Sequence, residues 1–198
     1  MKIAQILASD VWGEVTPEAF KRGIGGREGA MMRLAREWAK LGHEVTNFVS
    51  IKESLRFKEE PRFSSMNHDL DMGHHEYVPI ELARPVMENF YFDAAVAWEC
   101  PSVFGSPKLR DHVPVRVTEM QVAHFMPREV DYAAEYCHAV CALSDWHAEF
   151  LLSSGLEMAR DEVVTLPNGV DIQSYPERGD LGFRRDGAWY ARGGIYCT

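Results

Sequence analysis

The sequence has no long apolar run, and this absence excludes the commonest kind of membrane protein. No stretch approaches the 18 or more consecutive apolar residues that a spanning helix needs. The apolar start at residues 3–8 is interrupted by Asp10 before it reaches the length of a signal-peptide core. We therefore expect no membrane span and a cytoplasmic location.

Basic residues are also scarce. The chain has 21 Lys and Arg against 30 Asp and Glu, a formal charge of −9 and a pI of about 5.4. Nucleic acids and anionic membranes bind surfaces on which Lys and Arg cluster, so neither is an expected partner. P-loop and Gly-x-Ser-x-Gly motifs are absent as well, which removes the usual NTPase and hydrolase interpretations.

Cysteine is too sparse for a disulfide framework or a zinc site. The four cysteines are Cys100, Cys137, Cys141 and Cys197. None forms a Cys-x-x-Cys pair, so free thiols are expected. Cys137, His138 and Cys141 lie close in sequence but run into an expected strand without a second ligand pair, and His74-His75 is expected in a loop. We predict no metal site.

The apolar residues that are present predict an α/β domain. At 198 residues and 46% apolar content, the chain can bury one full core. Short apolar runs are typical of buried parallel strands and occur at residues 2–8, 44–50, 76–80, 93–98, 113–118, 139–143 and 162–166. Helical segments between them indicate a Rossmann-like, mostly parallel sheet with helices on both faces.

Residues 28–41 carry the clearest helical pattern. The expected apolar face consists of Met31, Leu34, Ala35, Trp38 and Leu41. Gly42 is expected to end this helix, and Ser144 to cap a second one that reaches about residue 153. Polar residues 52–75 predict a surface excursion without regular structure. We expect one domain at residues 1–176 and, at 177–198, an irregular tail or the start of another domain.

A glycine-rich loop at residues 23–29 precedes the first helix. Glycines and a helix N-terminus allow a phosphate to approach the backbone, although a simple turn explains the same residues. The dinucleotide fingerprint is not met, because Glu28 stands where its third glycine belongs and the loop begins well after the first strand. A nicotinamide-dependent oxidoreductase is therefore disfavoured.

Five segments resemble family 4 glycosyltransferases of the GT-B class. Residues 23–48, GIGGREGAMMRLAREWAKLGHEVTNF, are similar to the opening loop and helix of that family. The other similar segments are DAAVA at 93–97, PVRVT at 114–118, ALSDWHAEF at 142–150 and LPNGVD at 166–171. Together they cover most of residues 1–176, in the order that the N-terminal, acceptor-side domain of the family would have.

The resemblance implies a retaining transfer of sugar from a nucleotide-sugar to a carbohydrate acceptor, with no further cofactor. Gly25, Gly26 and Arg27 would then face the diphosphate of the donor or the acceptor, although Arg27 also suits a solvated surface position. Many members have a histidine in a Thr-x-His pattern, where this chain has Thr118-Glu119-Met120. His124 is the nearest substitute and the candidate catalytic residue.

Two further groups of residues are candidates for roles in the cleft. Glu99 follows an expected strand, at the end where open α/β sheets bind ligands, and is a candidate contact to the acceptor. In the resemblance, Asn168, Gly169 and Asp171 would shape the hinge between two domains, since these residue types favour tight turns.

The family's second domain binds the donor. Only 27 residues follow Asp171, so we expect that domain to be missing, and either another chain supplies it or this chain is a truncated remnant. An apolar cleft face left uncovered by the missing domain would favour self-association. The alternative is a non-catalytic module that binds a carbohydrate or a partner.

Overall fold

The computed structural model describes residues 1–8, 15, 26–58, 74–121, 127–167, 183–185, 188–190 and 196–197. The chain divides into two compact units, Met1–Pro167 and Asn168–Thr198. In the smaller unit, β9 (Phe183–Arg185), β10 (Ala188–Tyr190) and β11 (Tyr196–Cys197) form an antiparallel sheet in the order β11-β10-β9. These strands lie where we expected an irregular tail or the start of another domain.

The larger unit is built on an eight-stranded sheet in the order β3-β4-β2-β1-β5-β6-β7-β8. Its strands are β1 (Lys2–Leu7), β2 (Glu44–Val49), β3 (Leu55–Lys58), β4 (His74–Pro79), β5 (Ala94–Trp98), β6 (Val115–Met120), β7 (Ala139–Ala142) and β8 (Val163–Thr165). All are parallel to their neighbours except β3, which pairs antiparallel with β4 at the sheet edge. The predicted Rossmann-like α/β fold is confirmed.

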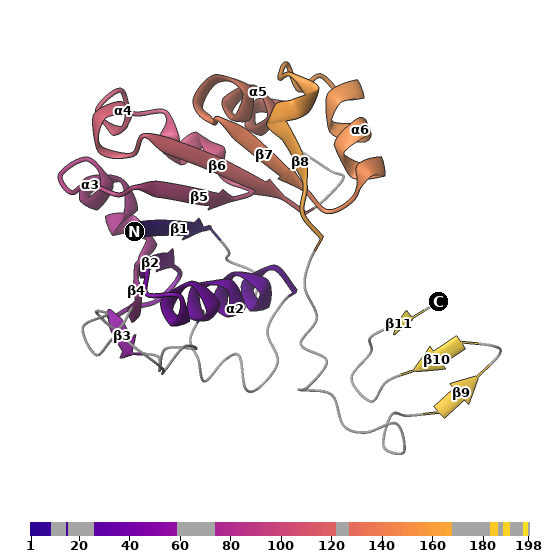
Figure 1. Ribbon diagram of the computed structural model, residues 1–198, viewed down its shortest axis with the longest axis horizontal. Coiled ribbons are helices and arrows are strands. Elements are labelled where there is room, and N and C mark those ends of the chain that lie inside the picture. The colour runs from indigo at the N-terminus through magenta and orange to yellow at the C-terminus, as the bar shows by residue number, and fades with distance from the viewer. Residues whose placement is uncertain are drawn as a thin grey trace, which may run out of the picture. The chain divides into compact units, whose positions relative to one another are not determined.

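Helices cover both faces of the sheet (Figure 1). The side chains of β1 pack against helices on each face. Ala4 and Ile6 pack in a core cluster that includes residues of α3 (Ala83–Met87) and α4 (Leu109–His112). Leu7 belongs to a cluster on the other face, beside Met31 of α2 (Gly26–Lys40). Alternate residues of a strand point to opposite faces, and here both faces are buried, so β1 is apolar after the exposed Lys2 except at Gln5.

A buried polar network fixes α2 on the sheet. The side chains of Gln5 and Asn47 are fully buried. Gln5 Nε2 donates to the carbonyl of Met31, at 3.3 Å, and to Asn47 Oδ1, at 3.0 Å. Gln5 Oε1 accepts from Trp98 Nε1 at 3.0 Å. One side chain thus joins β1, β2, β5 and α2, and a satisfied buried network of this kind favours one placement of the helix.

The first helix begins two residues earlier than predicted and its buried face is rotated. The buried residues are Glu28, Gly29, Met31, Met32, Ala35 and Ala39. Leu41, expected in that face, is 53% exposed because the helix ends at Lys40. Gly42 ends the helix as predicted: its φ is 87°, its N–H donates to the carbonyl of Ala39, and the N–H of His43 donates to that of Trp38.

The second predicted helix is also present. In α6 (Asp145–Ser153), the hydroxyl of Ser144 accepts from the N–H of His147 at 3.1 Å, the expected N-cap bond.

The segments that sequence patterns did not identify are η1 (Ile80–Leu82), α3, η2 (Pro101–Phe104), α4, α5 (Pro127–Tyr136) and η3 (Arg160–Glu162). Most are too short to show a helical period. Within the described residues, no helix is both long and apolar enough to cross a membrane.

The prediction of an irregular excursion at residues 52–75 is wrong at both ends. Residues 55–58 form β3, and His74 and His75 begin β4 instead of lying in a loop. His75 is buried at 5% exposure and its ring meets that of Tyr77 edge to face, with centroids 5.6 Å apart. The strand β3 and the first two residues of β4 escaped notice because polar side chains are tolerated where a strand lies near an edge.

Candidate active site

The sheet reverses its direction of growth beside β1. From β1 the chain passes through α2 to β2 on one side, and later returns to β5 on the other side of β1 (Figure 1). In open α/β sheets, ligands bind outside the carboxyl ends of the strands at such a switch point. The N-terminus of α2 and the residues that follow β5 and β6 are therefore the place to look for a site.

Two residues selected from the sequence meet at this position. The Arg27 guanidinium, in the first turn of α2, forms an ion pair through Nη1 with Oε2 of Glu99, directly after β5. Arg27 Nη2 also lies 3.5 Å from Oε1 of Glu28. The side chains are 21% exposed for Arg27, 16% for Glu99 and 2% for Glu28, so the charges are largely withdrawn from solvent.

Glu99 has an unusual backbone conformation. Its φ is 58°, in the left-handed region that side chains other than glycine seldom adopt. Three hydrogen bonds hold Glu99 in this conformation. Its N–H donates to the carbonyl of Glu119 at 2.9 Å, its Oε1 accepts from the N–H of Gln121 at 3.1 Å, and its Oε2 accepts from Arg27. Local strain of this kind is concentrated at functional sites.

Glu119, near the end of β6, supplies a second buried carboxyl group. It is 5% exposed, and its Oε2 has no hydrogen-bond partner among the described residues. Its pKa is raised from 4.5 to about 7, mainly by burial; the charge of Glu99 contributes to this rise, while a hydrogen bond from Gln121 and the charge of Arg27 oppose it. A carboxyl group that titrates near neutrality can exchange a proton under physiological conditions.

The resulting cluster is acidic. Arg27 is its one cation in the described part of the chain, against the carboxyl groups of Glu28, Glu99 and Glu119. A diphosphate placed here would meet negative charge, because Arg27 is already neutralised by Glu99. Carboxylate oxygens are instead good acceptors for the hydroxyl groups of a sugar.

Gly26 is the first residue of α2 and is exposed. A Cβ atom built on it would meet nothing within 4 Å, so the position is open and a ligand has access to the helix N-terminus. The other residues selected from the sequence, Gly25, His124 and the three hinge residues Asn168, Gly169 and Asp171, lie outside the described residues.

Sequence reasoning did not select Glu119 or Gln121. A signal was present, since Glu119 is an acidic residue within the strand VRVTEM, close to its carboxyl end. Its burial and its nearness to Glu99 could not be read from the strand, because they depend on the pairing of β5 with β6, which places Trp98 opposite Glu119.

The cysteines add no nucleophile to this cluster, although Cys100 follows Glu99 and Cys141 pairs with Glu119 in the sheet. Cys100, Cys137 and Cys141 are free thiols, and burial raises their pKa values to about 12, 12 and 11. Thiols with such pKa values are almost entirely protonated at neutral pH and are poor nucleophiles. Within the described ranges, no group of three or more His, Cys, Asp or Glu side chains is arranged to hold a metal ion.

No protein-family model matches this chain, and no curated protein does. Solved structures do match. The structure of HepE from Anabaena in complex with UDP and glucose has a TM-score of 0.52 and 15% identity, over 92% of this chain and 48% of HepE. Its complex with UDP-glucose has a TM-score of 0.50 and 14% identity over the same shares. This likeness is one of fold, and the chain spans about half the length of HepE.

Proposed function

We propose that residues 1–176 are the acceptor-side domain of a glycosyltransferase, which moves a sugar from a nucleotide-sugar to a carbohydrate acceptor with retention. The observed fold, the resemblance of five segments to GT-B enzymes and the similarity to a protein that holds UDP and glucose support this role. A donor-binding domain, in the same protein or on a partner chain, would complete the cleft. In this proposal His124 faces the transferred sugar, and residues 168–171 form the hinge.

One observation carries the proposal: the acidic cluster of Arg27, Glu28, Glu99 and Glu119 lies at the switch point of the sheet. Its net negative charge favours the acceptor over the diphosphate for the position beside Arg27. Glu99, held by Arg27 and by the N–H of Gln121, is fixed in orientation before any ligand arrives. Preorganised acceptors of this kind select the geometry of a sugar's hydroxyl groups.

Binding measurements test the donor site and the acceptor site separately. Calorimetry with UDP-glucose, GDP-mannose and the free nucleotides tests for a donor site, and NMR titration with a panel of neutral hexoses and disaccharides tests for the acceptor site. We expect carbohydrate to shift the amide signals of Arg27, Glu99 and Gln121 at millimolar concentration. Carbohydrate binding without transfer, after a donor-binding domain is added, would favour the non-catalytic module. No carbohydrate binding at these residues would refute the acceptor site.

Substitution of Gly26 by tryptophan tests the position of the site. Gly26 is exposed, with open space around its Cα, so a tryptophan should fit without unfolding α2 but should cover the approach to Arg27. We expect the variant to lose carbohydrate binding at least about tenfold, a loss of about 1.4 kcal/mol, with the midpoint of urea unfolding little changed.

The matched control is Arg33→Trp, at an exposed position further along α2. It adds the same indole to the same helix and should bind carbohydrate like the unmodified protein. Equal binding by the Gly26 and Arg33 variants would place the ligand elsewhere.

A further inference from the structure

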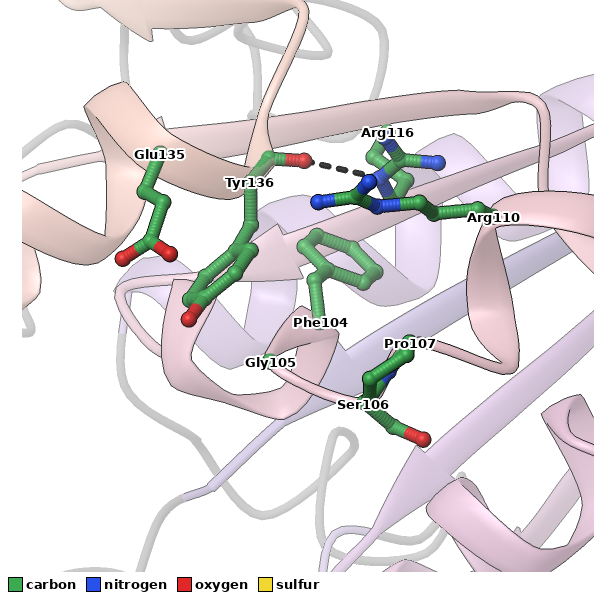
Figure 2. A pocket seen from close by; sticks show the side chains of 8 residues that line it. All are labelled: Phe104, Gly105, Ser106, Pro107, Arg110, Arg116, Glu135 and Tyr136. Atoms are coloured by element: carbon green, nitrogen blue, oxygen red, sulfur yellow. Dashed lines mark hydrogen bonds between the residues drawn. The ribbon is translucent and has the colours of Figure 1, made fainter.

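A hollow lies at the start of β6, at the opposite end of the strand from Glu119. It has a volume of about 440 Å³, within the usual range for small-molecule pockets. Its lining comes from η2, α4 and the loop between them, from the start of β6 and from the end of α5. The lining residues are Phe104, Gly105, Ser106, Pro107, Arg110, Arg116, Glu135 and Tyr136. Figure 2 shows the guanidinium groups of Arg110 and Arg116 next to each other, near the rings of Phe104 and Tyr136.

Arg116 is held rigidly by the backbone. Its Nε donates to the carbonyl of Tyr136 at 2.7 Å, and its Nη1 donates to that of Val113 at 2.8 Å. Its Nη2 has no partner among the described residues. Two bonds to neutral carbonyls orient the guanidinium but leave its charge without a counterion. Burial, and then the charge of Arg110, lower the pKa of Arg116, against an opposing effect of Cys137.

Arg110 is exposed, and its side chain makes no hydrogen bond or ion pair with any described residue. The carboxylate of Glu135 forms no ion pair with either arginine among the described residues, and its presence raises the pKa of the Tyr136 hydroxyl. The hollow therefore carries two guanidinium groups close together and one carboxylate. Two like charges side by side repel each other, and an anion bound between them offsets this cost.

We propose that this hollow binds the phosphoryl group of a small phosphate monoester between Arg110 and Arg116. Arginine presents a planar fork of donors that matches phosphate oxygens, and two of them together suit a dianion better than a single carboxylate. The remaining volume, beside the ring of Tyr136, leaves room for the organic part of the ligand. The site is independent of the proposed transferase activity, since it lies at the opposite end of β6 from the acidic cluster.

The test is an NMR titration of the purified chain that follows the arginine side-chain Nε–Hε signals. The probes are inorganic phosphate and glycerol 3-phosphate, with glycerol as the neutral counterpart and sodium chloride at matched ionic strength. We expect both phosphates to shift the Arg116 signal with millimolar affinity, and glycerol and chloride to leave it in place. Shifts of equal size with chloride, or no shift with phosphate, would overturn the proposal.

Arg110→Gln should weaken binding of both phosphates about tenfold, because it removes one of the two charged donors. The side chain is exposed and unbonded, so the fold and the urea midpoint should be retained. Arg33→Gln is the matched control, with the same loss of charge on α2, on the other face of the sheet. If Arg110→Gln binds phosphate as well as the control does, the site is not the one proposed. The titration of the unmodified chain decides the question by itself should the variant fail to fold.

Discussion

Replacing Arg27 by alanine should lower the free energy of unfolding by about 2 kcal/mol at pH 8, somewhat less than the loss of a fully buried ion-pair partner. The variant leaves Glu28 and Glu99 withdrawn from solvent without the cation that lies between them. Urea unfolding followed by circular dichroism measures the change.

Two companion variants identify the cause of this loss. Arg33→Ala removes an exposed arginine from the same helix and should change the free energy of unfolding by less than about 0.5 kcal/mol. Arg27→Lys keeps the charge but not the fork of donors, and should recover part of the stability. If Arg27→Ala lowers the free energy of unfolding no more than Arg33→Ala does, the ion pair of Arg27 and Glu99 behaves as a solvated surface pair.

Replacing Glu119 by glutamine should stabilise the protein at pH 8 by about 3 kcal/mol, because folding raises the pKa of this carboxyl group from 4.5 to about 7. The glutamine is close in shape but cannot ionise, so it removes the cost of a buried charge. At pH 4 the two proteins should have nearly equal stability.

Proton linkage explains why the stability of the unmodified protein falls as the pH rises. The pKa of Glu119 is raised from 4.5 in the unfolded chain to about 7 in the folded one. Between these values the folded protein holds a proton that the unfolded chain has released, so stability falls as pH rises from 4.5 to 7 and stays lower above 7. Urea unfolding at pH 4, 6, 7 and 8 should show this fall in the unmodified protein and a smaller one in Glu119→Gln.

Glu81→Gln is a suitable control, because Glu81 is exposed and its substitution should leave the pH profile unchanged. A profile for Glu119→Gln that parallels that of the unmodified protein at every pH would show that another group is responsible. The same titration bears on the proposed acceptor site, since Glu119 can accept a bond from a sugar hydroxyl through both oxygens only when it is ionised.

Short-range patterns were enough to predict the fold. Apolar runs at the strands, Gly42 after the first helix and Ser144 before a later one are local signals, and the structure confirms each. Short helices such as α4 (Leu109–His112), which are less than two turns long, gave no period to detect. The edge strand β3 was missed for a related reason, since its four residues depend on pairing with β4 for their structure.

The sequence by itself determined the parallel α/β sheet, and it selected Arg27 and Glu99 as candidates for a site. It did so because strand and helix periods, caps and glycine stops are encoded within a few neighbouring residues. Only the tertiary structure decided that these two side chains neutralise each other, that Glu119 is buried beside them, and that Arg110 and Arg116 face one hollow. The contacts of Arg27, Glu99 and Glu119 join residues far apart in the chain, and they exist because strand order and helix placement bring together charges whose burial no local pattern records.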